Sequence, residues 1–155
     1  MVDPTPRPFL PDQPGHLVRR LQQASVALFM AQTAEQAITP VQFAALIATH
    51  EQPGMDQRTL ADTIGFDTST IGGVIDRLER RGLVQRNLAP HDRRVRLLTV
   101  TPAGEALLAQ VLPGVRATQE RILAPLSDTE RPVFMALLHK LVQAHAGLPP
   151  GASGD

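Results

Sequence analysis

Apolar residues recur at helical spacing along most of the chain, and the clearest pattern lies between residues 67 and 82. The apolar positions of this segment fall at i, i+3, i+4 and i+7: Ile71, Val74, Ile75 and Leu78. This spacing predicts a helix with one buried stripe, capped by Asp67 and ended by Gly82. The opposite face is small at one end and basic at the other: Ser69, Gly73, Asp76, Arg77 and Arg80. The pattern therefore predicts a helix that packs on a core and offers a polar face to a partner.

A second, shorter helix is predicted directly before it, over residues 57–64. Asp56 suits its N-cap and Gly65 its end, so that a tight glycine turn joins the two helices as a helix-turn-helix. The helix before these opens at Thr39-Pro40-Val41-Gln42, which has the form of a capping box with proline at the first helical position. Gln52-Pro53-Gly54 is expected to end it.

After Gly82 the hydrophobic pattern changes period. Residues 83–86 and 95–100 are short runs of β-favouring residues, and the loop between them carries Pro90 and two arginines. These runs predict a two-stranded hairpin with a basic tip.

The helices outside this region are richer in apolar residues than one small domain can cover. The first spans His16 to about Gln32, and the others begin at Thr101-Pro102 and at a second capping box formed by Ser127 and Glu130. Pro113 is expected to bend the helix that starts at Thr101 or to force a local break. The surplus apolar surface predicts packing on the same helices of a second copy, and hence a homodimer.

These elements predict a mainly α fold with a small β-hairpin wing, in which a winged helix-turn-helix lobe is joined to N- and C-terminal dimerisation helices. The lobe takes residues 39–100, and the dimerisation region takes residues 15–38 and 101–146. The proline-rich residues 1–14 are expected to form a flexible arm, and residues 147–155 a flexible tail.

Charge is distributed unevenly, although the formal net charge is zero. Between Arg77 and Arg96 there are seven arginines and two acids, Glu79 and Asp92. A local basic region of this kind is typical of a nucleic-acid contact, although a solvated charged face is the alternative. The chain has no cysteine, which excludes disulfides and thiol redox sensing. With no secretory pattern and no run near the roughly 18 apolar residues of a membrane span, the protein is expected in the cytoplasm, without membrane contact.

An enzyme is the first rival class, and the sequence argues against it. The five histidines are spread over four predicted elements, with only His139 and His145 on one helix and without matching acids, and the chain carries no His-Glu-x-x-His motif, phosphate loop or nucleophile elbow. We therefore expect no catalytic residues, no cofactor and no metal site. The second rival is a winged-helix module that binds proteins instead of DNA. An apolar outer face on residues 67–82 would mark it, whereas this face is polar.

The helix-turn-helix, the segment LERRGLV at 78–84, the segment HDRRVRLLTVTPAG at 91–104 and the flanking helices together resemble the MarR family of bacterial transcriptional regulators. The resemblance covers roughly residues 15–145. It implies a homodimer of winged lobes that binds pseudo-palindromic operator DNA as a repressor and is released by a small ligand. A constitutive DNA-binding or protein-interaction module without an effector is the alternative.

The resemblance also implies which residues contact DNA. By position these are Thr68, Ser69, Thr70 and Arg77 on bases or phosphates, Arg94 in the minor groove beside Arg93, and Gln57 and Arg58 on phosphates. Gly73 would clear the outer face for close approach to a groove, and Asp92 would hold the wing arginines. In the simpler interpretation, Thr68 to Thr70 only cap the helix, and Arg80 and Arg81 are solvent-exposed or pair with Asp76 and Glu79.

The segment GHLVRRLQQ resembles the start of the first helix in family members that respond to aromatic carboxylates such as benzoate or nicotinate derivatives. Arg19 would pair with the carboxylate, since a guanidinium offers two parallel donors. His16 and Ser25 would add hydrogen bonds. Stacking would fall to Phe29 and Phe43, because the chain has neither Trp nor Tyr. In the alternative interpretation, Arg19 closes an ion pair between subunits.

Overall fold

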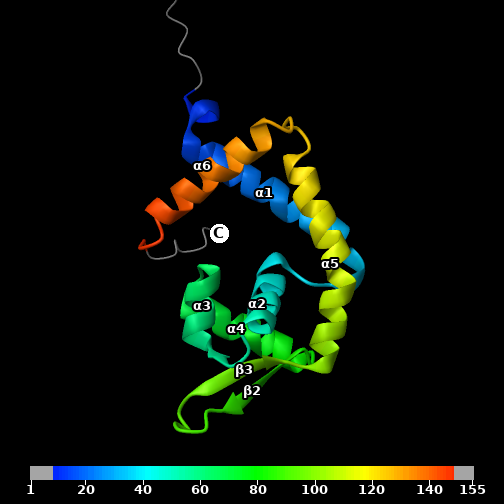
Figure 1. Cartoon of the computed structure of the whole chain (residues 1–155), viewed down its shortest axis with the longest axis vertical. Coiled ribbons are helices and arrows are strands. Elements are labelled where there is room, and N and C mark those ends of the chain that lie inside the picture. The colour runs from blue at the N-terminus through cyan, green and yellow to red at the C-terminus, as the bar shows by residue number, and fades with distance from the viewer. Residues whose placement is uncertain (1–8, 149–155) are drawn as a thin grey trace, which may run out of the picture.

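The computed structural model describes residues 9–148 and is mainly helical, with one small antiparallel sheet. The elements follow in the order η1 (Leu10–Asp12), α1 (Pro14–Gln32), η2 (Ala34–Gln36), α2 (Pro40–Glu51), β1 (Met55–Asp56), α3 (Gln57–Ile64), α4 (Thr68–Arg80), β2 (Val84–Leu88), β3 (Arg96–Val100), α5 (Pro102–Leu123) and α6 (Glu130–Ala144). Figure 1 shows α2, α3, α4 and the sheet grouped at one end, α1 and α6 at the other, and α5 running between them along one side. The predicted fold class is confirmed.

The core of the lobe is built on the apolar stripe of α4. All four predicted residues of the stripe are at most 3% exposed: Ile71, Val74, Ile75 and Leu78. They pack with Leu46 of α2, Leu60 of α3 and Leu98 of β3, each at most 1% exposed. Burial of a side chain of this size contributes about 1.5–3 kcal/mol. The stripe therefore fixes which face of α4 is left for a partner.

The sheet has three strands in the order β1-β3-β2. The predicted hairpin is confirmed as the antiparallel pair of β2 and β3, and the third strand, β1, was not predicted. Met55 pairs with Leu98 and Asp56 with Leu97, both antiparallel. A two-residue strand has no period that a sequence pattern can reveal. Asp56 also caps α3, accepting a hydrogen bond from the Thr59 amide at 2.7 Å, and this was the only role its sequence indicated.

The junction between the sheet and α5 is held by Thr101. Its hydroxyl donates to the Gly82 carbonyl at 2.5 Å and accepts from the Gly104 amide at 3.1 Å, while its own amide donates to the Leu83 carbonyl at 3.0 Å. A Cβ at Gly104 would overlap the Leu83 carbonyl oxygen. The Thr-Pro-x-Gly sequence therefore allows the start of α5 to lie directly on the turn that ends α4.

Helix α5 runs without interruption through Pro113, so of the two expected effects, a bend or a local break, the break was wrong. A proline removes one amide donor from a helix. At this point α5 is supported from outside by the end of α1. A Cβ at Gly114 would lie 2.5 Å from the Gln32 carbonyl oxygen, so the two backbones touch here.

Two helix starts differ from the predicted ones. Helix α1 begins at Pro14, two residues before His16, and η1 occupies part of the predicted arm. Helix α6 begins at Glu130, but the predicted capping box is present in the preceding turn: the Ser127 amide donates to Glu130 Oε2 at 2.9 Å, and the Glu130 amide donates to Ser127 Oγ at 3.4 Å. The remainder of the predicted arm and tail, residues 1–8 and 149–155, lies outside the described residues. Over the range that the structure describes, no helix is long and apolar enough to cross a bilayer.

Candidate nucleic-acid interface

The N-terminus of α4 is capped by Asp67, as predicted. Asp67 Oδ1 accepts from the Thr70 amide at 2.7 Å and Oδ2 from the Thr70 hydroxyl at 2.5 Å. These bonds from the Thr70 hydroxyl and amide hold the pKa of Asp67 below its ordinary value. Because Asp67 is the cap, the exposed side chains of Thr68 and Ser69 are not needed for capping. They stand at the exposed tip of the helix, where DNA contact stays a prediction.

Two adjacent glycines on α4 have different surroundings. A Cβ at Gly72 would lie 2.9 Å from Nε2 of Gln57, whose amide donates to the Thr68 carbonyl at 3.0 Å. Gly72 therefore makes room for the side chain that joins α3 to α4, a reason that the sequence did not reveal. Gln57, predicted to contact phosphate, has this internal partner, while Arg58 beside it is exposed. A Cβ at Gly73 would meet nothing within 4 Å, so this part of the outer face is open.

The two acids of α4, Asp76 and Glu79, form ion pairs with Arg86 of β2. Arg86 Nη2 bonds to Asp76 Oδ1 at 2.5 Å, and Nη1 bonds to Glu79 Oε2. Burial alone would lower the pKa of Arg86, but the hydrogen bonds that its guanidinium donates to Asp76 and Glu79 outweigh burial and raise the pKa above its ordinary value. The interpretation that Arg80 or Arg81 pairs with these acids was wrong. Arg80 Nε instead donates to the Asp76 carbonyl at 3.2 Å.

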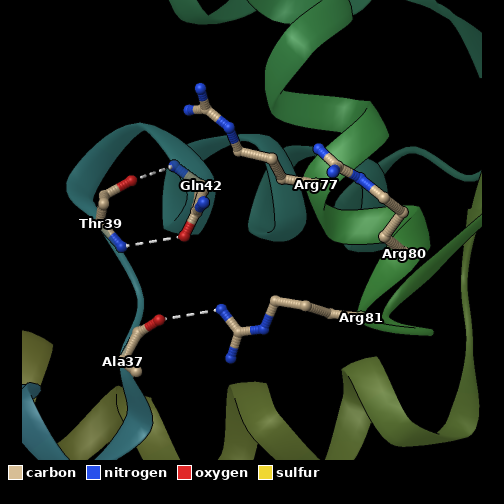
Figure 2. Close-up of a pocket in the computed structure, with 6 residues that line it drawn as sticks. All are labelled: Ala37, Thr39, Gln42, Arg77, Arg80 and Arg81. Atoms are coloured by element: carbon tan, nitrogen blue, oxygen red, sulfur yellow. Dashed lines mark hydrogen bonds between the residues drawn. The ribbon is translucent and has the colours of Figure 1, made fainter.

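Arg77 and Arg80 of α4 and Arg81, the residue after it, line a pocket of about 660 Å³. Figure 2 shows the three arginines around this pocket, with Arg81 reaching across to Ala37 before α2. The other lining residues are Ala37, Thr39 and Gln42. Arg81 donates to the Ala37 carbonyl at 2.9 Å and to the Gln36 carbonyl at 3.1 Å. Thr39 and Gln42 form the predicted capping box of α2, in which each side chain bonds to the backbone amide of the other residue. The pocket therefore lies between this capped helix start and three guanidinium groups.

The wing tip is shaped by Asp92. Its Oδ1 accepts from the Arg94 amide at 2.9 Å, and its carbonyl accepts from the Val95 amide at 3.0 Å. Asp92 thus holds the wing through the backbone of Arg94, not through an arginine side chain. Both Arg93 and Arg94 are exposed, which leaves their guanidinium groups available to a ligand.

The predicted ligand residues fall into three groups. His16 Nδ1 lies 3.3 Å from Arg19 Nη2 on the exposed first turns of α1. Phe29 and Phe43 pack with ring centroids 5.9 Å apart and planes tilted by 49°, and Phe29 belongs to the core. Ser25 lines a separate pocket of about 580 Å³ between α1, α5 and α6. The described chain therefore does not bring the predicted set together in one cavity.

Apolar side chains are exposed along α1 and α6. Those more than half exposed are Leu17, Val18, Val133, Leu137, Leu141 and Val142. Four of them, Leu17, Val18, Leu137 and Leu141, line an almost wholly apolar pocket formed by both helices, and Val18 also lines the pocket of Ser25. A surface of this kind is unusual on a monomer and typical of a protein interface.

Comparison with known proteins agrees with this geometry. The MarR family model matches residues 38–95. The HTH-type transcriptional repressor NicR of Pseudomonas putida is 33% identical over 133 residues, which cover 86% of this chain and 84% of NicR. The PcaV transcriptional regulator from Streptomyces coelicolor, in complex with its natural ligand, has a TM-score of 0.82 at 37% identity, covering 90% of this chain and 99% of that one. BpsR of Bordetella bronchiseptica, whose DNA binding is regulated by 6-hydroxynicotinic acid, has a TM-score of 0.82 at 33% identity, covering 88% and 97%.

Proposed function

Because the chain belongs to the MarR family of winged helix-turn-helix transcriptional regulators, we propose that it is a homodimeric repressor of a pseudo-palindromic operator, released by a small aromatic carboxylate. The observation that carries this proposal is the outer face of α4, which is polar, exposed and left free by a fully buried opposite stripe. The repressor NicR is a relative along most of both chains. Such a function places the protein in the cytoplasm, with the chromosome.

Helix α4 enters the major groove, which is about 12 Å wide and admits one helix. Thr68, Ser69 and Thr70 stand at its leading end, and Gly73 leaves space for the groove wall. Arg77 contacts base or phosphate farther along the helix. Arg94 enters the neighbouring minor groove from the wing tip, beside Arg93, and Gln57 and Arg58 lie near phosphates at the start of α3.

A second copy covers the exposed apolar residues of α1 and α6. Six large apolar side chains, each more than half exposed, would otherwise face water. A twofold pair places two α4 helices about one duplex turn apart, matching a pseudo-palindromic operator. Sedimentation of the purified protein at micromolar concentration tests this, and a monomer there would contradict it.

DNA binding is tested with a duplex of about 30 base pairs that the protein selects from a random pool. Arg94→Ala is expected to weaken binding across sequences and to reduce the steepness of the salt dependence by about 0.9 per protomer. The matched control is Arg116→Ala, which removes an exposed arginine of α5 remote from the wing. An unchanged salt slope in Arg94→Ala would remove Arg94 from the interface.

The effector proposal is supported by the chemistry of α1 and by BpsR, a relative that responds to an aromatic acid. Arg19 is exposed, and its described polar neighbour is the imidazole ring of His16. A guanidinium in this setting can bind a carboxylate through two hydrogen bonds. Ser25, Phe29 and Phe43 belong to this proposal as further ligand contacts, although they lie apart within one chain.

We expect 6-hydroxynicotinate or benzoate to raise the melting temperature of the wild type and of Arg20→Ala, but not of Arg19→Ala. Arg20 is the exposed neighbour of Arg19 on the same helix and therefore controls for charge. Equal shifts in all three proteins would place the ligand elsewhere. If no aromatic acid affects the wild type or its DNA complex, the chain is a constitutive DNA-binding module.

A further inference from the structure

The pocket lined by Arg77, Arg80 and Arg81 lies at the opposite end of α4 from Thr68 and Ser69. None of its lining residues is an acid. The nearest acids on α4 are Asp76 and Glu79, and Arg86 bonds to both from β2. Arg86 thus neutralises the two acids on the side of α4 that faces the wing. The side that faces α2 carries only the positive charges of Arg77, Arg80 and Arg81.

Three guanidinium groups at one pocket repel one another unless an anion lies between them. Arg81 is held by the Ala37 and Gln36 carbonyls, which fixes its position but leaves its charge. Within residues 9–148, neither Arg77 nor Arg80 has a carboxylate within 4.0 Å. The pocket therefore has the charge to bind an anion that is not part of the described chain.

The start of α2 offers an anion few donors. Pro40 has no amide hydrogen, and the Gln42 amide already donates to Thr39 Oγ1 at 3.3 Å, so only the Val41 amide remains of the first three residues, together with the helix dipole. An anion must therefore be held mainly by the arginines. Guanidinium groups suit the oxygen pairs of phosphate particularly well.

The length of α4 indicates which part of a duplex would lie here. Ser69 and Arg80 are eleven positions apart, which is roughly 16 Å along a helix axis. The major groove is only about 12 Å wide. If the leading end of α4 reads bases, Arg80 lies past the edge of the groove, where the sugar–phosphate backbone runs. The pocket is open and, at about 660 Å³, has room for a segment of a polyanion.

We propose that this pocket binds a backbone phosphate of the operator and that Arg80 is its principal donor, with Arg77 and Arg81 beside it. This inference rests on the proposed DNA binding and adds to it a contact at the end of the footprint opposite the leading tip of α4. A phosphate contact positions the protein on the duplex without reading sequence. Loss of such a contact should therefore lower the affinity for DNA and the salt dependence of binding, and leave the preference among base sequences unchanged.

The test compares wild type, Arg80→Gln, Arg80→Lys and Arg116→Ala on the duplex selected from a random pool. Arg80→Gln is expected to bind roughly tenfold to a hundredfold more weakly and to lose about 1.8 from the salt slope, since a dimer loses two phosphate contacts. The affinity ratio between the selected duplex and one with altered half-sites stays unchanged. Arg80→Lys retains most of the slope, because the charge remains, and Arg116→Ala behaves as wild type.

A wild-type slope in Arg80→Gln would overturn the phosphate site while leaving DNA binding intact. A reduced ratio between the two duplexes would overturn it as well, because it would make Arg80 a base contact. A wild type that selects no duplex would instead overturn the proposed function, and the phosphate site with it. Circular dichroism and the melting temperature of Arg80→Gln establish that it is folded; the side chain is exposed.

A free phosphate compound could occupy the same arginines, and a separate arm of the test distinguishes this source. Inorganic phosphate is titrated into the DNA-free protein at constant ionic strength. Stabilisation of the wild type but not of Arg80→Gln, together with an unchanged salt slope on DNA, would assign the pocket to a free anion and overturn the inference. No stabilisation, together with the reduced slope, supports the operator phosphate.

Discussion

The ion pairs of Arg86 are expected to fix the wing on α4, and replacement of Arg86 by methionine removes them while keeping a long side chain. Arg86 lies in β2 with 22% of its side chain exposed, and its partners Asp76 and Glu79 are 58% and 40% exposed. The Arg86 amide also donates to Glu79 Oε1 at 3.3 Å, and the substitution leaves this backbone bond in place. Methionine retains the apolar stem.

The loss of unfolding free energy expected for Arg86→Met follows from the exposure of the three paired side chains. Solvent-exposed ion pairs contribute about 0.2–1 kcal/mol each. Both pairs share one largely covered guanidinium, so we place their sum toward the upper end, at about 1–2 kcal/mol of unfolding free energy. For a chain of this size, that corresponds to a fall of roughly 3–6 °C in melting temperature. High salt should reduce the difference, because both acids are accessible to ions.

Urea unfolding at a fixed protein concentration measures the loss, since dimer formation would make stability depend on concentration. A double-mutant cycle of Arg86→Met with Glu79→Gln isolates one pair, and we expect a coupling of about 0.5–1 kcal/mol. Additive effects within about 0.3 kcal/mol would refute the structural role of the pair. The single variant Arg86→Met also leaves the carboxylates of Asp76 and Glu79 without their arginine partner, on the helix that is proposed to face DNA. The operator affinity of this variant should therefore fall as well.

Other substitutions test the packing and capping of α4 and α5. Gly104→Ala should destabilise the fold by about 2 kcal/mol or more, because its Cβ would overlap a backbone carbonyl; an unchanged melting temperature would contradict the close approach. Gly73→Ala should raise stability by about 1 kcal/mol, since its Cβ meets open space and alanine is the better helix former. Gly72→Ala should gain little in the wild type, because it displaces the Gln57 amide, but should gain about 1 kcal/mol in a Gln57→Ala background; equal effects in both backgrounds in urea unfolding would exclude that clash. The pKa of Asp67 is lowered in the folded state, so its contribution to stability is full above the ordinary aspartate pKa and is lost as pH falls through the folded value. Asp67→Asn should therefore flatten the fall of melting temperature below about pH 4, and a curve parallel to that of the wild type would contradict this.

Local signals in the sequence predicted the helices and the hairpin of the lobe correctly, although not the short strand β1. The caps Asp56 and Asp67 bind amides three residues ahead, and the apolar stripe of α4 repeats within one helix. Such features depend on neighbours a few residues apart and are visible in a single sequence. The features that were missed depend on pairs that are distant in sequence. Gln57 reaches Thr68 and fills the space over Gly72, and no local pattern indicates that contact.

The partners of the charged side chains of α4 also could not be predicted from local sequence patterns. Helical spacing allowed Arg80 and Arg81 either to be solvent-exposed or to pair with Asp76 and Glu79, since such neighbours lie on adjacent turns. The acids instead bond to Arg86, because β2 turns back along α4 after Gly82 and brings a less exposed guanidinium to them. Within the candidate interface, periodicity could predict which residues are exposed. It could not predict which of them are already engaged by another part of the fold.

Helix α5 links the lobe to the helices of the expected dimer interface through two contacts that leave no space for a Cβ. At one end, Gly104 lies against the Leu83 carbonyl, and ten residues later Gly114 lies against the Gln32 carbonyl at the end of α1. The two contacts are roughly 15 Å apart along one helix. Close-packed contacts cannot absorb a displacement by compression, so a shift of α1 must move α5 and, through Thr101, the turn that ends α4. Because α4 carries the proposed DNA-reading face, a ligand or partner that displaces α1 would change the separation of the two α4 helices in a dimer. Operator half-sites about one turn apart tolerate little change in that separation, so binding at α1 is positioned to control DNA binding at α4 without contacting it.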